Sequence, residues 1–126
     1  MQLPINPVVT AQKHSPMNSS VKVVRPTGIL DSSQAGDFRQ QIGDLVHDGA
    51  GAVIVDFQDV TFMDSSGLGA LVLALKTVRS AEAEMYVCSM NEQVKMLFEL
   101  TSMDRVFKIF ANADAVESWL AANPPS

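Results

Sequence analysis

The segment Val53–Val78 constrains the fold most, because it predicts a strand, a short polar loop and a helix in direct succession. The strand is a β-branched and aromatic run that ends at Phe57. Asp56, Asp59 and Asp64 are expected in the loop. The helix begins at Asp64-Ser65-Ser66-Gly67 and then carries apolar residues at helical spacing: Leu68, Leu71, Val72, Leu75 and Val78.

The same succession of strand and helix precedes this segment. Val21–Arg25 is a predicted strand, which Pro26–Gly28 ends. Asp31 and Gln34 predict a capping box at the start of a helix, and Gly49 is placed to end that helix. One face of the helix is apolar and is predicted to be buried: Ala35, Phe38, Ile42, Leu45 and Val46.

Two further strand and helix units follow the central segment. Met85–Ser89 and Val106–Phe110 are predicted strands. Ser89 and Glu92 predict a capping box before a short helix, and Asn112 is expected to cap a last helix. The inward residues of these two helices are predicted from their spacing: Val94, Leu97 and Phe98 in the first, and Val116, Trp119 and Leu120 in the second.

Short apolar strands that alternate with helices predict an α/β fold with a mostly parallel central sheet of about four or five strands and about four helices. The 126 residues are enough for one domain. Residues 1–19 hold three of the six prolines, so we expect an extended or flexible N-terminal arm there and a folded domain over residues 20–122.

Charge and composition exclude several classes of partner. The net charge is −5 and the chain has no Lys/Arg cluster, which argues against binding to nucleic acid or to an anionic membrane. No apolar run reaches the roughly 18 residues of a membrane span. The single cysteine, Cys88, lies in an apolar run and is predicted to be a small buried residue in a protein of the reducing cytoplasm.

Polar residues follow two of the predicted strands directly. In parallel α/β sheets, functional groups gather outside the carboxyl ends of the strands. Asp31 and Asp64-Ser65-Ser66 are therefore predicted to lie along one rim of the sheet. The two hydroxyls are at a helix N-terminus, where free N–H groups and the helix dipole can accept a phosphate group.

Most chemistries at this rim lack a required residue. A serine hydrolase would need a glycine two positions before the nucleophile. Met63 occupies that position relative to Ser65, and Asp64 occupies it relative to Ser66. There is no phosphate-binding glycine motif and no cluster of metal ligands. A phospho-aspartate receiver could use Asp56, but its Mg²⁺ site needs an acidic pair after the first strand, and only Asp31 is there.

The remaining possibility is a hydroxyl that accepts a phosphate group and so acts as a switch. A phosphate adds about −1.5 to −2 charges and three acceptor oxygens. The helix N-terminus would tolerate this group within the domain, whereas an interface with a partner would not. We therefore expect phosphorylation to dissociate the partner rather than to refold the domain. The alternative is that Asp64-Ser65-Ser66 is only an N-cap, which chemistry alone favours, and the same holds for Asp31.

The motif Asp59-Val-Thr-Phe-Met-Asp64-Ser65-Ser66-Gly67-Leu68-Gly69 resembles that of STAS domains, and specifically of bacterial anti-sigma factor antagonists. The resemblance extends from about residue 20 to about residue 120. It departs from the family in the proline-rich arm and in the turn Ala81–Glu84, where a glycine is common. Four other segments carry the resemblance: Gly28–Asp31, Val53–Phe57, Val94–Phe98 and Val106–Phe110.

The resemblance implies a STAS-type fold and a binding module without catalysis or cofactor. The implied partner is an anti-sigma factor that is also a serine kinase and phosphorylates Ser65, and a metal-dependent serine phosphatase restores binding. By binding the anti-sigma factor, the unphosphorylated form would free a sigma factor and so regulate transcription. An alternative is a constitutive STAS adaptor subunit of a signalling or lipid-transport complex. The implied partner-binding residues are Asp31, Asp64, Ser66, Gly67 and Leu68.

Overall fold

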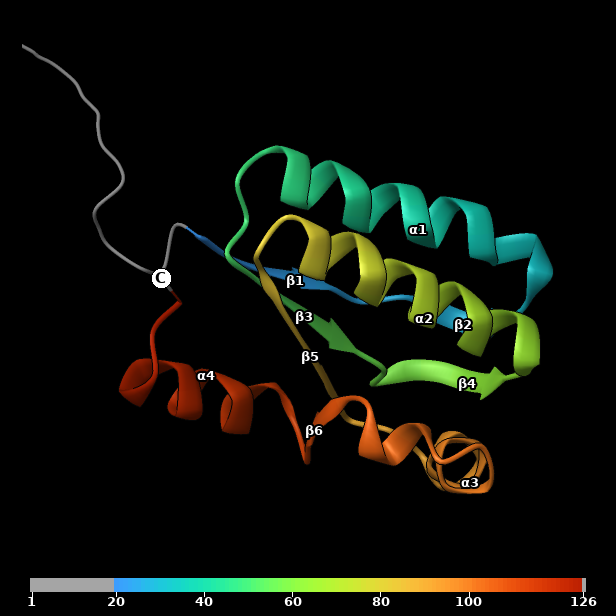
Figure 1. The fold of residues 1–126 in the computed structure, drawn as a ribbon. Helices are drawn as coiled ribbons and strands as arrows, with labels where there is room; N and C mark the ends of the chain where they lie inside the picture. The colour runs from blue at the N-terminus through green and yellow to red at the C-terminus, as the bar shows by residue number, and fades with distance from the viewer. Residues whose placement is uncertain (1–19, 126) are drawn as a thin grey trace, which may run out of the picture.

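The computed structural model describes residues 20–125, so the predicted arm over residues 1–19 lies outside the described residues. Six strands and four α-helices follow one another along this part of the chain (Figure 1). In chain order they are β1 (Val21–Val24), β2 (Thr27–Leu30), α1 (Ser32–His47), β3 (Ala52–Asp56), β4 (Asp59–Met63), α2 (Ser65–Ser80), β5 (Glu84–Cys88), α3 (Glu92–Leu100), a 3₁₀ turn (Met103–Arg105), β6 (Lys108–Phe110) and α4 (Ala113–Ala122).

All strand pairs are parallel. The main sheet has the order β1-β3-β5-β6, and β2 pairs with β4 in a second, two-stranded sheet. Helices α1 and α2 lie on one side of the main sheet and α4 lies on the other (Figure 1). The predicted α/β class, the mostly parallel sheet and the four helices are thereby confirmed.

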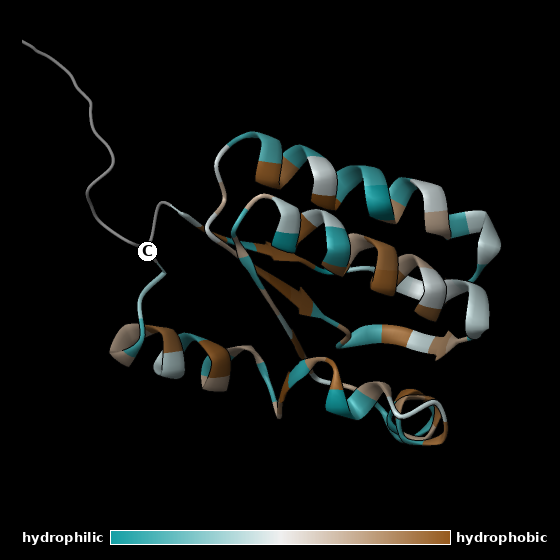
Figure 2. Ribbon diagram, in the orientation of Figure 1, coloured by the Kyte–Doolittle hydropathy of each residue, from teal (hydrophilic) through white to brown (hydrophobic). Residues whose placement is uncertain are grey.

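Two cores lie on the opposite faces of the sheet. The larger one contains the apolar faces of α1, α2 and α3, including the fully buried Ile42, Leu71 and Phe98. The smaller one lies under α4, where Val116 and Leu120 pack on the sheet. Strand β3 is buried from end to end and is apolar along nearly its whole length (Figure 2), because it lies between the two cores.

The sequence prediction was wrong about the two segments that form the second sheet. Asp59–Met63 was expected as a loop but is strand β4. The first strand ends before Pro26 as predicted, but a new strand, β2, begins at Thr27 and was not predicted. Each segment carries turn-type residues, Gly28 in one and Asp59 in the other, and neither has the continuous apolar run of β3. They are strands because each supplies the other with a partner, with Leu30 opposite Met63.

A bulge in β4 determines which side chains face inward. The strand register passes from Gly28 opposite Val60 to Ile29 opposite Phe62, so Thr61 is an extra residue. Val60 and Met63 are therefore both buried although they are three residues apart, an odd spacing that simple alternation forbids. The bulge thereby turns Met63 into the core immediately before α2 begins.

The helix ends follow the predictions in part. Asn112 caps α4, and Gly49, with φ of +98°, follows the end of α1 as predicted. Asp31 caps α1, and its carboxylate accepts hydrogen bonds from the backbone N–H and the hydroxyl of Ser33, with the Gln34 backbone N–H also stabilising its charge. The capping box predicted at Ser89 was wrong, because α3 begins two residues later and its cap is Asn91.

Candidate functional site

Two helix N-termini meet at the end of the second sheet. Leu30 and Met63 are register partners, so the next residues, Asp31 and Asp64, follow neighbouring strand ends. Each carboxylate caps the helix that it precedes. Oδ1 of Asp31 accepts from the Ser33 backbone N–H at 2.9 Å and from the Ser33 hydroxyl at 2.6 Å, while Oδ1 of Asp64 accepts from the Gly67 N–H at 3.0 Å.

Two exposed hydroxyls lie beside these carboxylates. Ser65 and Ser66 are the first two residues of α2, and both are exposed. The described part of the chain offers neither side chain a hydrogen-bond partner. Because the Asp64 side chain accepts from Gly67, the N–H groups of Ser65 and Ser66 are available at the positive end of the helix dipole. This end of α2 can bind an anionic group.

Gly67 permits the close approach of α2 to β2. A Cβ at this position would lie 2.1 Å from the carbonyl oxygen of Leu30, which is far inside van der Waals contact. The same carbonyl accepts from the Asp64 N–H at 3.4 Å. Gly67 is buried and Leu68 is only 6% exposed, so both of these predicted partner-binding residues lie behind the surface that carries Ser65 and shape it from within.

The carboxylate of Asp31 is stabilised in its ionised form. The Ser33 hydroxyl and the Ser33 backbone N–H donate to it, and these hydrogen bonds hold the pKa of the carboxyl below its ordinary value of 3.8. Asp31 therefore presents a negative charge at this rim throughout the physiological pH range.

The sequence reasoning missed an exposed apolar pair beside the rim. Ile29 and Phe62 are register partners, and they are 52% and 45% exposed. Each directly precedes a buried residue at the end of its strand. The signal was present: successive residues of a strand face opposite sides, so two apolar neighbours cannot both enter one core. Apolar side chains in this position favour contact with a partner.

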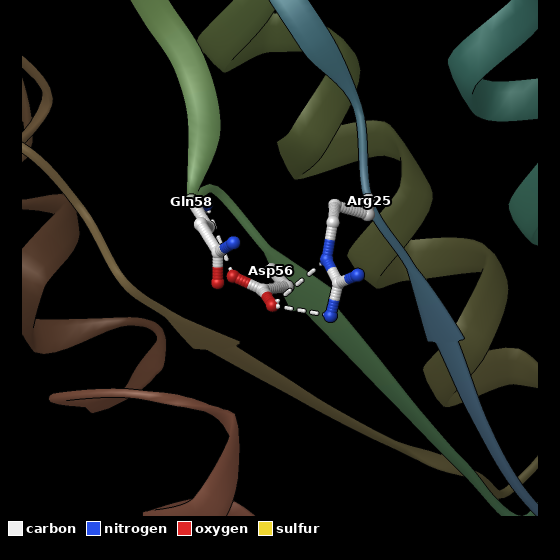
Figure 3. A network of polar contacts seen from close by, with 3 residues as sticks. All are labelled: Arg25, Asp56 and Gln58. Atoms are coloured by element: carbon white, nitrogen blue, oxygen red, sulfur yellow. Dashed lines mark hydrogen bonds and ion pairs between the residues drawn. The ribbon is translucent and has the colours of Figure 1, made fainter.

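Asp56, the residue that a receiver-type mechanism would phosphorylate, is fully buried and engaged (Figure 3). Its Oδ2 lies 3.0 Å from Nη2 and 3.1 Å from Nε of Arg25, and its Oδ1 accepts from the Gln58 N–H at 3.0 Å. A phosphodonor cannot reach this carboxylate without opening the fold. The pair instead ties the end of β3 to the residue that follows β1.

Other site classes find no support in residues 20–125. No group of three or more His, Cys, Asp or Glu side chains in this range is arranged to bind a metal ion. None of the helices described here has the length and apolar character that crossing a membrane requires. Cys88 is fully buried as predicted, and burial raises the pKa of its thiol.

An interrupted parallel sheet, four helices and the Asp-Ser-Ser-Gly start of α2 together define the class of small α/β domains known as STAS domains. Residues 12–116 match the sequence profile of this domain. The chain therefore belongs to the STAS domain family. The match begins before residue 20, and the predicted boundary between the arm and the domain stays a prediction.

Anti-sigma factor antagonists are among the proteins that are similar to this chain. The anti-sigma-B factor antagonist of Staphylococcus aureus is 29% identical over 80 residues, which cover 64% of this chain and 74% of the relative. A candidate anti-sigma factor antagonist of known structure from Thermotoga maritima is 26% identical, with a TM-score of 0.73 and coverage of 79% and 86%. The Bacillus cell fate determinant SpoIIAA in its phosphorylated form shares the fold, with 21% identity, a TM-score of 0.59 and coverage of 76% and 87%.

Proposed function

We propose that this protein is an anti-sigma factor antagonist that is switched by phosphorylation of Ser65. In its unphosphorylated form it binds an anti-sigma factor that is a serine kinase, and so regulates transcription without catalysing a reaction itself. The observation that supports this most is the exposed, unbonded Ser65 hydroxyl at the N-terminus of a 16-residue helix, within the motif of the family. The names of the relatives support the same role.

The domain tolerates a phosphate at Ser65 because of where the hydroxyl lies. The group projects into solvent, so no core packing changes. The N–H groups of the first turn of α2 and the helix dipole stabilise the added negative charge. Repulsion by Asp64 and Asp31 opposes this, but at a solvated surface it is screened. We therefore expect the phosphorylated chain to keep its fold.

The interface does not tolerate the same phosphate. A kinase that phosphorylates Ser65 must bring the phosphates of its nucleotide to this hydroxyl, and afterwards the new dianion faces the remaining nucleotide phosphates. A contact with the partner excludes water from this surface, which strengthens the repulsion between the new dianion and those nucleotide phosphates. Phosphorylation therefore releases the partner.

The remaining roles follow from the positions of the residues. Asp31 and Asp64 provide negative charge that engages the kinase, and Ser66 contributes a second hydroxyl to the contact surface. Gly67 and Leu68 set the shape of that surface. A metal-dependent serine phosphatase, acting in the cytoplasm with the kinase, restores the binding form.

The test is mass spectrometry of the full chain isolated from its own cells under several growth conditions. We expect one phosphate on Ser65, no phosphate on Ser65→Ala, and normal phosphorylation of the control Ser80→Ala, an exposed serine at the C-terminal end of the same helix. The Ser65→Asp chain should lose the anti-sigma factor that co-purifies with the wild type, whereas Ser65→Ala should retain it. If Ser65 is unmodified under every condition, the switch is wrong and a constitutive adaptor is favoured.

A further inference from the structure

The outer edge of β4 is covered by side chains instead of a strand. Within the described residues β4 pairs with β2 alone, because β5 pairs with β3 and β6. Backbone groups at a strand edge still need hydrogen-bond partners. The start of α3 provides them: Asn91 Nδ2 donates to the carbonyl oxygens of Val60 and Thr61, at 3.2 Å each.

Gln93 makes the most specific of these contacts. Its Nε2 donates to the carbonyl oxygen of Met63 at 2.7 Å, and its Oε1 accepts from the N–H of the same residue at 2.9 Å. A primary amide carries a donor and an acceptor side by side, so it reproduces both bonds of a neighbouring strand. The orientation of the amide follows from the backbone, since Met63 offers one donor and one acceptor.

Met63 connects this contact to the candidate phosphoacceptor. Its side chain is fully buried, and the next residue, Asp64, is the N-cap of α2. On the other side, Gly67 packs against the Leu30 carbonyl of β2. The start of α2 is thus held from two directions, by β2 through backbone packing and by α3 through one glutamine side chain. Figure 1 shows α3 lying next to β4 on the side opposite α1 and α2.

We propose that Gln93 is a positioning residue for the Ser65 hydroxyl, an inference that rests on the proposed function. Its amide fixes the end of β4, and through Met63 and Asp64 it fixes the place at which α2 presents the acceptor oxygen. Phosphoryl transfer requires that oxygen to lie in line with the bond that breaks, and a small displacement costs a large part of the rate. Gln93 acts through Met63 and does not itself take part in the transfer.

The experiment compares the full wild-type chain with Gln93→Leu, Gln93→Glu and the control Gln40→Leu. Gln93→Glu keeps the size and the acceptor but loses the donor, so it separates the hydrogen bond from packing. Gln40→Leu makes the same substitution on helix α1, where it removes one exposed amide hydrogen bond, from Nε2 to Oδ1 of Asp44 at 2.9 Å. Two quantities are measured: hydrogen exchange of the bonded amides of Met63, Asp64 and Gly67, and the phosphorylated fraction of Ser65 in the chain's own cells.

We expect both Gln93 variants to exchange these amides about tenfold faster, because two hydrogen bonds to Met63 are weakened or lost. The phosphorylated fraction of Ser65 should fall about fivefold in chains that are still folded, as exchange in β3 will show. Gln40→Leu should match the wild type in both measurements. If Gln93→Leu does not fold, Gln93→Glu decides.

Two results overturn the proposal. Unchanged exchange at Met63, Asp64 and Gly67 means that Gln93 does not hold the strand end. Faster exchange with unchanged phosphorylation means that its role is structural only. Failure of the proposed function is seen differently, because then the wild type and Gln40→Leu carry no phosphate on Ser65 either, and the positioning role falls with it.

Discussion

At the scale of single residues, the site depends on residues that fix the backbone where the two helices begin. Gly67 is present because the Leu30 carbonyl occupies the space that a Cβ would need. Asp31 and Asp64 are each the N-cap of a helix, and each also presents a carboxylate at the rim. The capping interpretation and the site interpretation of these aspartates are therefore compatible, because a cap leaves one carboxylate oxygen free.

Gly67→Ala should destabilise the protein. The added methyl group forces α2 away from β2, and overpacking of this kind costs about 1–3 kcal/mol. Gly69→Ala is the control, since a Cβ there meets nothing within 4 Å and alanine favours the helix by about 0.5–1 kcal/mol. Urea unfolding measures both. Equal stability of the two variants would contradict the close packing seen at Gly67.

Asp31 should contribute to the loss of stability in acid. Its pKa is lowered in the folded state, so its contribution is present above the unfolded value near 3.8 and is lost as pH falls through the lower folded value. Unfolding by urea between pH 6 and pH 3 should show a shallower acid decline for Asp31→Asn than for the wild type. Parallel curves would show that the Ser33 hydrogen bonds do not stabilise the ionised carboxylate.

At the scale of the elements, two strand interruptions create the rim. The chain runs from β1 to β2 and from β3 to β4 with two residues between the strands, so the second sheet extends beyond β5 and β6. The pair of Arg25 and Asp56 lies at these interruptions and connects them (Figure 3). Strand β4 then depends on β2 at one edge and on α3 at the other.

Arg25→Met should therefore weaken the junction. It leaves the buried Asp56 carboxylate without its cation, which costs about 3–5 kcal/mol at a fully buried site. Because the Arg25 side chain is 49% exposed, we expect about 2 kcal/mol. Lys95→Met, which breaks the exposed pair with Glu92, should change stability by less than about 0.5 kcal/mol. Thermal unfolding of both variants distinguishes a structural tie from a surface ion pair.

At the scale of the whole molecule, the two cores share the strands β3 and β5. Ile54 and Tyr86 belong to the core under α4, while Val55 and Val87 belong to the larger core. Neither core can therefore open without affecting the sheet. The rim lies at one end of this unit, so a partner that binds there need not disturb either core.

Cys88 reports on the opening of this unit. It is fully buried in the smaller core and its pKa is raised by burial, so a thiol reagent should modify the folded protein at least about a thousandfold more slowly than the unfolded chain. The rate should rise with urea along the global unfolding curve. Rapid modification without denaturant would show that the core under α4 opens separately from the rest.

Much of this structure was predictable because it is encoded in neighbouring residues. A pattern only a few residues long is enough to predict each of these features: the strands β1, β3, β5 and β6, the four helices, the N-caps Asp31, Asp64 and Asn112, and the burial of Cys88. Apolar spacing and cap residues act locally, so reading them needs no knowledge of the fold.

Only the tertiary structure decided the features that join distant residues. Strands β2 and β4 exist as a pair, the buried Asp56 is paired with Arg25, and Gln93 contacts Met63 across 30 positions of the chain. Ile29 and Phe62 are 52% and 45% exposed on the paired strands β2 and β4. The physical reason is the same in each case: a hydrogen bond, an ion pair or a buried face between segments far apart in sequence depends on packing that no short stretch encodes.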